Sequence, residues 1–312
     1  MFRGTIWIPP DTRIPFIRLR MLFFAISGAV VGASLLLIAI HGLNYGVDFT
    51  GGIMIEARFP GPVDVAATRT KVDSLDLGGT EIQSFGGPNE VLIRLPRQEG
   101  DEKAQGRAVE KVKSALGASV EYRRVETVGP KVGAELLRES IVAVIVSLGG
   151  IMIYLWFRFE WKWGAAGIAA LFHDVISTVG IFSLTGLEFN LSTVAAVLTI
   201  AGYSINDTVV IFDRVRENLR KFKAMPLSEL FDRSINETLS RTINTAGTVF
   251  LTVAALCIFG GPVIRDFSLA MLWGVVFGTY SSICVALPML LYMNIDRGSH
   301  DRSAPEAAPG AR

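Results

Sequence analysis

The sequence has few of the residues that build disulfide frameworks, metal centres and most catalytic sites. It contains two cysteines and three histidines among 312 residues. Cys257 and Cys284 lie inside apolar segments, with no histidine or second cysteine at metal-ligand spacing. The sequence therefore predicts no disulfide and no metal site, and we interpret both cysteines as small apolar packing residues. It also predicts no cofactor and no enzymatic activity.

Charged residues are also scarce, at 19%, whereas 50% of the residues are hydrophobic. This balance is too apolar for an ordinary soluble domain of this length and indicates an integral membrane protein. The formal net charge of +1 excludes the basic excess that nucleic-acid binders need for phosphate contacts. We therefore expect the membrane as a partner, and no nucleic acid.

Apolar segments of roughly 18 residues or more are long enough to cross a hydrocarbon core. Six segments meet this length: residues 21–41, 137–157, 164–186, 190–212, 242–261 and 267–292. The first follows several arginines and resembles the basic end of a signal peptide. It has full bilayer length and no small-residue cleavage site after it, so we predict an uncleaved first span.

The distribution of positive charge predicts the orientation of these spans. With residues 1–20 in the cytoplasm, the short outer loops contain only Arg265. The inner loops and the tail then hold most of the basic residues: Arg158, Lys162, Arg214, Arg216, Arg220, Lys221, Lys223, Arg233, Arg297 and Arg302. Because Lys and Arg concentrate in cytoplasmic loops, we expect both termini in the cytoplasm.

Residues 42–136, between the first two spans, predict a folded α+β domain in the periplasm. The expected elements are strand 53–59, helix 63–75, strands 81–85 and 91–96, helix 101–116 and strand 120–128. The order β-α-β-β-α-β is that of a ferredoxin-like domain. The predicted fold is therefore a bundle of six transmembrane helices, residues 21–41 and 137–292, with one such domain.

Two further segments complete the predicted organisation. Apolar residues recur at helical spacing over about 226–240, which predicts an amphipathic cytoplasmic helix between the fourth and fifth spans. Such a helix lies on the inner membrane surface or packs on the bundle, and the sequence favours neither. Residues 293–312 are polar and rich in Pro, Ala and Gly, so we expect a disordered cytoplasmic tail.

Asp207 lies inside the fourth predicted span. It precedes Asp213, at the inner end of that span, by six residues, so it is about 9 Å deep. An aspartate at the centre of a bilayer helix costs roughly 2.5–3.5 kcal/mol. Ser204 lies on the same helical face and Asn206 is adjacent. We interpret Asp207 as part of a proton pathway; the alternative is a carboxylate permanently hydrogen-bonded between helices.

Arg241, at the inner end of the fifth span, is the best candidate partner for Asp207. It opens a polar face on which hydroxyls recur at three- and four-residue steps: Thr242, Thr245, Thr248 and Thr252, with Asn244 beside them. We expect this face to point into the bundle. Arg241 meets Asp207, or it anchors the helix at the lipid head groups; the sequence weighs these two readings evenly.

His173 and Asp174 form a second polar pair, in the third span. Asp174 is about 15 Å from the inner end of that span, a depth similar to that of Asp207. A carboxylate whose partner changes and an adjacent histidine are both suited to carrying protons. The alternative, slightly favoured for this pair, is an interhelical hydrogen bond that is already satisfied.

The segment 46–52, Gly-Val-Asp-Phe-Thr-Gly-Gly, follows the first span directly. Gly51 and Gly52 permit unusual backbone angles, and Asp48 can accept hydrogen bonds from local amides. The segment lacks the lysine of a phosphate-binding loop and precedes a strand, so we expect a structured exit from the membrane and no nucleotide site.

Four motifs together resemble the SecF family, the smaller membrane subunits of the bacterial SecDF protein-export accessory complex in the resistance-nodulation-division superfamily. They are the 46–52 segment, His-Asp-Val at 173–175, Gly-Tyr-Ser-Ile-Asn-Asp-Thr-Val-Val-Ile-Phe-Asp-Arg-Val-Arg-Glu-Asn at 202–218, and Leu-Ser-Arg-Thr-Ile-Asn-Thr at 239–245. The 202–218 block is long and specific, and the resemblance covers essentially the whole membrane region.

The resemblance implies that Asp207 and Arg241 take part in proton-coupled motion. It also implies the partners SecD, with a similar six-span bundle, the SecYEG channel, often YajC, and a translocating unfolded polypeptide. On this reading the chain is an auxiliary subunit of the Sec translocase that uses the proton-motive force with SecD in late steps of export. The alternatives are a proton-driven exporter of small molecules or lipids from the same superfamily, and a translocon scaffold without proton flux.

Overall fold

The computed structural model describes residue 9 and residues 12–85, 87–98, 102–261, 264–293 and 295. The chain divides into two compact units. The larger unit comprises Met1–Leu43, Ile145–Leu187 and Ala195–Arg312, and the smaller comprises Asn44–Val144 and Glu188–Val194. Nearly all of the tail that the sequence predicts to be disordered lies outside the described residues, as do residues 1–8.

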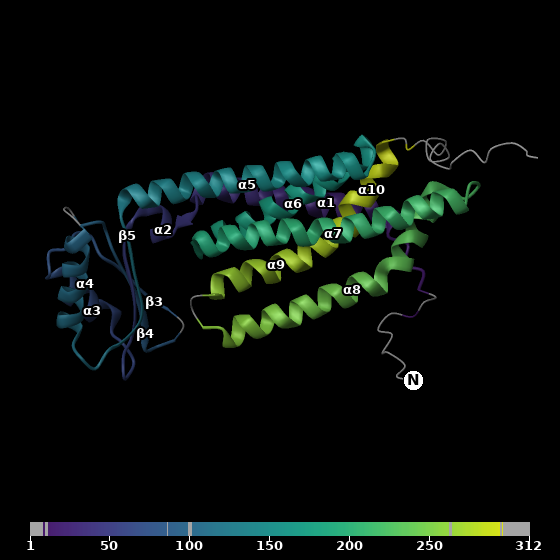
Figure 1. Cartoon of the computed structure of the whole chain (residues 1–312). Coiled ribbons are helices and arrows are strands. Elements are labelled where there is room, and N and C mark those ends of the chain that lie inside the picture. The colour runs from purple at the N-terminus through teal and green to yellow at the C-terminus, as the bar shows by residue number, and fades with distance from the viewer. Residues whose placement is uncertain are drawn as a thin grey trace, which may run out of the picture. The chain divides into compact units, whose positions relative to one another are not determined.

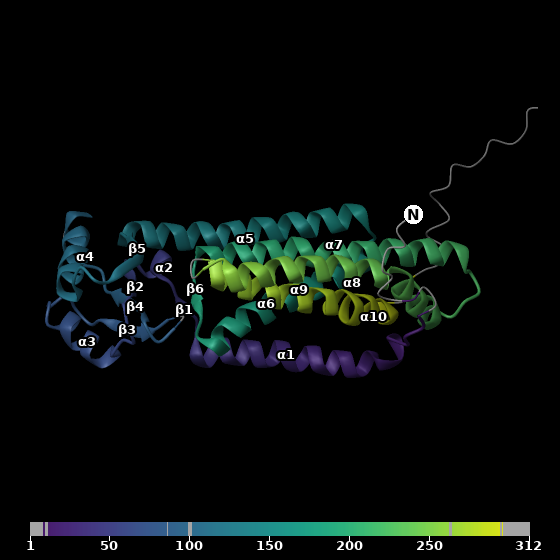
Figure 2. The ribbon, with the colours of Figure 1, turned by 90° about the horizontal axis from the view of Figure 1, so that it is seen from below.

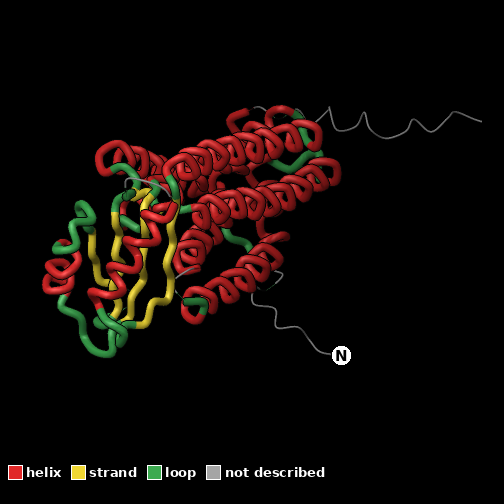
Figure 3. Tube along the Cα trace, turned by 60° about the vertical axis from the view of Figure 1, so that its left-hand side comes forward, coloured by secondary structure: helices red, strands yellow, loops and turns green. Residues whose placement is uncertain are grey.

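The smaller unit contains the α+β domain that the sequence predicts. Its elements are β2 (Gly52–Arg58), α3 (Val65–Asp73), β3 (Glu81–Ser84), β4 (Glu90–Leu95), α4 (Glu102–Leu116) and β5 (Glu121–Val128). The strands form one antiparallel sheet in the order β3-β4-β2-β5. Figure 3 shows both helices on one face of this sheet. The element order and the pairing match the ferredoxin-like arrangement.

The alternation of side chains along β2 gives its sheet two different faces. Ile53, Ile55 and Ala57 point to the helices and are buried against residues such as Val72 and Val112. Their neighbours Met54 and Glu56 point to the opposite face, because successive strand residues alternate. The helix-covered face is therefore the hydrophobic core of the domain, and the other face carries charge.

Six helices are long and apolar enough to cross a membrane, which confirms the predicted bundle. They are α1 (Arg20–His41, preceded by η1, Ile17–Leu19), α5 (Pro130–Arg158), α6 (Trp161–Thr185), α7 (Leu191–Lys221), α8 (Leu227–Phe259) and α9 (Arg265–Ser281) with its continuation. Figures 1 and 2 show the helices of the larger unit running side by side, with α1 along one edge.

The sixth span differs from the uninterrupted helix expected from the sequence. After α9 it passes through the π-helical segment η3 (Ser282–Ala286) into α10 (Leu287–Leu290) and η4 (Leu291–Met293). Pro288 has no N–H to donate to the carbonyl of Cys284, so an α-helical hydrogen bond is missing here. A local π turn is a common accommodation of such a break.

The predicted amphipathic helix at 226–240 and the fifth span are one continuous helix, α8. Its apolar residues Leu230, Phe231, Ile235 and Leu239 are buried in the core of the larger unit. Of the two readings that the sequence leaves open, the structure therefore supports packing on the bundle over a position on the lipid surface.

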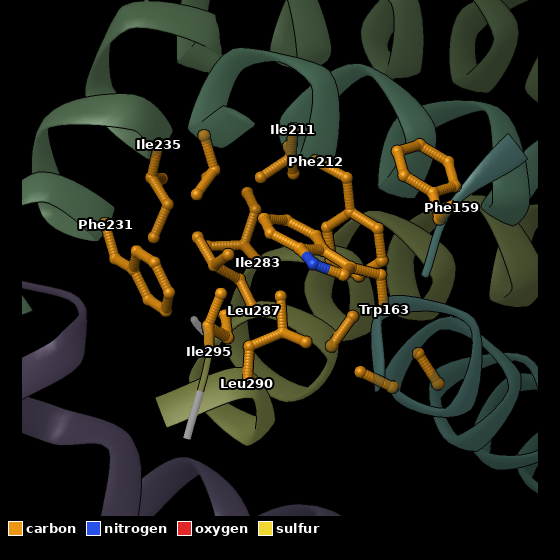
Figure 4. Close-up of a cluster of buried hydrophobic side chains, with 14 of the residues drawn as sticks. Phe159, Trp163, Ile211, Phe212, Phe231, Ile235, Ile283, Leu287, Leu290 and Ile295 are labelled. Atoms are coloured by element: carbon orange, nitrogen blue, oxygen red, sulfur yellow. The ribbon is translucent and has the colours of Figure 1, made fainter. Parts of the chain in front are cut away.

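The largest apolar cluster lies where the ends of several helices meet. Figure 4 shows Phe231 and Ile235 of α8 beside Ile283 and Leu287 of the sixth span, with Trp163 of α6 among the neighbours. The Trp163 ring contacts the Phe212 ring edge-on and stacks with the Phe159 ring. This cluster fixes the first half of α8 against α7.

The residues before α1 are latched to α8 by hydrogen bonds. The Asn236 amide accepts from Ile14 N and donates to Ile14 O, both at 3.0 Å. The Asp232 carboxylate accepts from Ile17 N at 2.8 Å. Asp232 thereby satisfies a backbone donor at the start of the first helix, a role usually taken by a residue adjacent in sequence.

Candidate functional site

Asp207 lies on α7 and is 3% exposed, so its carboxylate is buried. Its Oδ2 atom has no hydrogen-bond partner among the described residues. A buried polar atom left without a partner is uncommon and costs free energy. This oxygen of the carboxylate therefore retains bonding capacity for a proton or for another polar group.

Two hydroxyl groups near Asp207 also lack a hydrogen-bond partner among the described residues. The hydroxyl of Thr279, on α9, neighbours both Asp207 and Tyr203 but has hydrogen-bond geometry with neither. Neither the Tyr203 nor the Thr279 hydroxyl has a hydrogen-bond partner in the described part of the chain. Three polar groups from α7 and α9 thus share one region without bonding one another.

Among the described residues, Arg241 is the cation that acts electrostatically on Asp207. Its side chain is exposed. The two form no ion pair within 4.0 Å. The arrangement brings opposite charges together on α7 and α8 without closing a salt bridge.

The polar face of α8 is only partly turned inward. Thr242 is buried, but Asn244, Thr248 and Thr252 are exposed. The expectation that the whole face points into the bundle is wrong for this chain by itself. The Thr248 and Thr252 hydroxyls instead donate to carbonyls of their own helix, at 2.9 Å each, which allows them to face apolar surroundings.

Asp174 forms a different kind of site, because its carboxylate is completely satisfied. It is 0% exposed and accepts hydrogen bonds from Ser204 Oγ at 2.5 Å and Ser281 Oγ at 2.7 Å. Its other oxygen lies 2.9 Å from His173 Nδ1. These contacts join α6, α7 and α9, so the structure supports the interhelical hydrogen-bond reading of this pair.

The remaining predicted residues divide between these two places. Ser204 binds Asp174, although the sequence placed it on the same helical face as Asp207. Asn206 is exposed on the outer side of α7. His173 Nε2 has no hydrogen-bond partner among the described residues, and its ring lies beside Phe277 and Tyr280.

Sequence reasoning missed the contribution of the sixth span. Thr279 adjoins Asp207, Ser281 binds Asp174, and Ser282 Oγ lies 2.8 Å from Thr208 Oγ1. A run of four hydroxyl-bearing residues, 279–282, inside an otherwise apolar span was the available signal. Hydroxyls in a membrane helix commonly bond across to neighbouring helices.

The predicted exit motif is structured, as its glycines suggested. Residues Val47–Thr50 form the short helix α2, and Gly51 and Gly52 follow with φ of 71° and 126°. A Cβ on Gly52 would lie 2.7 Å from Leu95 O. Asp48 does not bond local amides; its Oδ2 accepts from Leu191 N, at the start of α7, at 3.0 Å.

The sequence of this chain matches that of a known protein family. The family model described as "Protein export membrane protein SecD/SecF, C-terminal" matches residues 108–296, and the SecD/SecF GG motif matches residues 36–60. The chain belongs to the SecF family. Asp48, Gly51 and Gly52 fall within the GG motif, and Asp174, Asp207 and Arg241 within the C-terminal family region.

Curated relatives named SecF match this chain over nearly their whole length. Protein translocase subunit SecF of Cereibacter sphaeroides is 43% identical over 299 residues, which cover 93% of this chain and 92% of the relative. The same-named protein of Magnetococcus marinus is 45% identical over 302 residues, covering 95% and 96%.

The solved structures that resemble this SecF-family chain are longer. SecDF of Thermus thermophilus matches with a TM-score of 0.84 and 37% identity, over 94% of this chain and 40% of that one. A second SecDF structure, in a super-membrane-facing form, matches with a TM-score of 0.69, 38% identity and coverages of 97% and 41%. The chain thus spans about two fifths of each SecDF chain.

Proposed function

We propose that this chain is an auxiliary subunit of the bacterial Sec protein translocase, which works with SecD and uses the proton-motive force to assist late steps of polypeptide export. SecYEG, a translocating unfolded polypeptide and YajC are the further partners in this proposal. Both termini are placed in the cytoplasm and the α+β domain in the periplasm, on the strength of the basic residues in the short inner loops.

The buried carboxylate of Asp207 carries this proposal. A proton crossing a potential of 100 mV releases about 2.3 kcal/mol, similar to the roughly 2.5–3.5 kcal/mol cost of an aspartate in a bilayer helix. The two energies are of the same order, so the gradient is an adequate energy source for a change of charge at a buried aspartate. The unbonded Oδ2 atom is available to receive the proton.

Charge on Asp207 would be converted into movement through Arg241. Ionised Asp207 attracts Arg241 and draws α8 towards α7, whereas protonated Asp207 releases it. The first half of α8 is packed, but beyond Thr242 only Val253 of this helix is buried within the described chain. The second half of α8 contacts α9 but buries few of its own side chains, so little packing opposes such a movement.

The test is proton conduction by the complex with SecD in reconstituted vesicles, together with gradient-dependent export. We expect Asp207→Asn to assemble normally but to lose conduction and gradient-dependent export. Asp213→Asn is the matched control, because it removes an exposed carboxylate from the same helix and should preserve both activities.

Equal conduction by wild type and Asp207→Asn would contradict the proposal and leave a translocon scaffold as the better reading. Loss of conduction with normal export would separate proton flow from protein transport. Recovery of a small molecule or lipid in place of a translocation channel on copurification would support the exporter.

A further inference from the structure

The segment that follows α1 is bound to the segment that begins α7. β1 (Asn44–Tyr45) and β6 (Glu188–Phe189) pair in parallel, and Gly46 N donates to Phe189 O at 2.9 Å. We call residues 44–52 and 188–193 the α1–α7 junction. The whole junction belongs to the smaller unit, together with the α+β domain.

Asp48 connects the junction to the backbone of α7. Its carboxylate accepts from Leu191 N, the first residue of the helix. The helix also has a cap of its own, since Asn190 Oδ1 accepts from Thr193 N at 3.0 Å. A negative group at a helix N-terminus is favoured by the helix dipole as well as by the hydrogen bond. Asp48 is therefore a second cap, supplied from 143 residues away in the chain.

Arg94 connects the junction to the α+β domain. It lies on β4, and its guanidinium is 3.1 Å from Glu188 Oε2 and donates to Asn44 Oδ1 at 3.1 Å. The Arg94 and Glu188 side chains are only 15% and 11% exposed. Ion pairs so removed from water are screened much less than surface pairs.

Close packing leaves this junction little freedom to slip. A Cβ on Gly46 would lie 2.7 Å from Glu188 Oε1, so any other residue would displace the carboxylate that Arg94 binds. A Cβ on Gly133, near the start of α5, would lie 3.0 Å from Phe49 O. The rings of Tyr45, Phe49 and Phe189 also contact one another.

We propose that the Arg94–Glu188 ion pair and the Asp48 cap form a mechanical joint through which movement of α7 is passed to the α+β domain. This inference rests on the proposed function, in which Asp207 responds to protons. The helix is continuous from Leu191 to Asp207 and beyond, a rise of about 24 Å. Asp207 therefore lies on the helix whose first residue is held by the Asp48 cap, and Arg94 and Asp48 are positioning residues outside the proton path.

The test compares proton conduction with gradient-dependent export in the full complex. We expect Arg94→Gln and Glu188→Gln to conduct protons as wild type does but to lose most of the gradient-dependent gain in export. The exchanged pair Arg94→Glu with Glu188→Arg should recover much of the loss, because the attraction is restored with the signs reversed.

Substitutions of Asp48 give a second test of the joint, which does not need an exchange of charges. Asp48→Asn keeps an oxygen that accepts from Leu191 N, so export should be retained; Asp48→Ala removes the acceptor and should uncouple export from conduction. The uncoupling is the readout that a purely stabilising role would not produce, since a destabilised protein loses both activities together.

The proposed joint would be overturned if Arg94→Gln and Glu188→Gln both exported protein as wild type does. It would also be overturned if variants that fold lost proton conduction and export together. The comparison of wild type with Asp207→Asn decides the proposed function separately. If these two conduct equally, the proposed function fails, and the joint, which has no proton-driven movement to pass on, fails with it.

Discussion

At the scale of single residues, two buried aspartates at similar depth have opposite surroundings. Asp174 binds two serines and a histidine, whereas Asp207 leaves one oxygen unbonded. The contacts of Asp174 tie three helices together, whereas the unbonded oxygen of Asp207 leaves room for a further polar group. The two acids therefore differ in their neighbours and not in their chemistry.

Removing one donor from the Asp174 clamp should affect stability more than transport. We expect Ser204→Ala to lower the free energy of unfolding by about 1–3 kcal/mol, measured by thermal unfolding in detergent. Thr199→Ala is the control on the same helix, because that hydroxyl donates only to Ala195 O of its own helix. Reduced proton conduction by Ser204→Ala without a loss of stability would instead place Asp174 in the proton path.

Glu56, on β2, makes the stability of the α+β domain depend on pH. It is 2% exposed, its Oε1 has no partner among the described residues, and burial raises its pKa above the ordinary value of 4.5. Arg123 and Arg124 oppose this shift and Glu90 adds to it. Below pH 4.5 the group is protonated whether the domain is folded or unfolded, so it costs nothing. Stability is then lost as pH rises through the folded pKa.

We therefore expect Glu56→Gln to stabilise the domain at pH 7 and to have little effect at pH 4. Hydrogen-exchange protection of the β2 amides in the full chain, corrected for the intrinsic exchange rate, measures this difference. A destabilised Glu56→Gln domain at pH 7 would show that ionised Glu56 is stabilised by its arginine neighbours.

At the scale of elements, glycines set how closely the membrane helices approach. A Cβ on Gly274 of α9 would lie 2.3 Å from Ile200 Cγ1 of α7, whereas a Cβ on Gly202 would meet nothing within 4 Å. The crossing of α7 and α9 brings Thr279 beside Asp207, and it brings Ser204 of α7 and Ser281 of α9 to the same oxygen of Asp174 on α6. Its spacing therefore controls both sites.

Gly274→Ala should destabilise the bundle by about 1–3 kcal/mol through overpacking. Gly202→Ala is its control on the partner helix and should not destabilise the bundle, because alanine is favoured over glycine in a helix interior by roughly 0.5–1 kcal/mol. Thermal unfolding of the two purified variants checks the difference. Equal stability would mean that α7 and α9 separate without cost, and a fixed spacing between them would no longer be supported.

At the scale of the whole molecule, the exposed polar face of α8 has the character of an interface. Asn244, Thr248 and Thr252 are exposed in a helix of membrane-spanning length, and polar groups in such helices usually face protein or water. In the proposed complex this surface belongs to the contact with SecD.

We therefore expect Thr248→Cys to form crosslinks with SecD in the assembled complex. Thr248→Cys is introduced after Cys257 and Cys284 are replaced by alanine, and Thr242→Cys, at a buried position, serves as the control. Crosslinking of Thr242→Cys in preference to Thr248→Cys would show that α8 faces SecD with its other side.

The elements of the molecule were predictable from its sequence because their signals are local. Six apolar runs and one βαββαβ pattern need only the periodicity of neighbouring residues. The partners of Ser204 and Asp48 were not predictable, since each bond depends on how distant elements are packed. Asp48 reads as a local turn former, and its actual partner, Leu191 N, could be found only from the fold.

The latch between the residues before α1 and α8 has a consequence for how the protein is made. Ile14 and Ile17 are synthesised first, but their partners Asn236 and Asp232 follow 222 and 215 residues later. At a synthesis rate of about 5–20 residues per second, the first helix waits roughly 10–45 s for its cap. A nascent chain that stops before the fifth helix thus leaves the residues before its first helix without the partners that hold them.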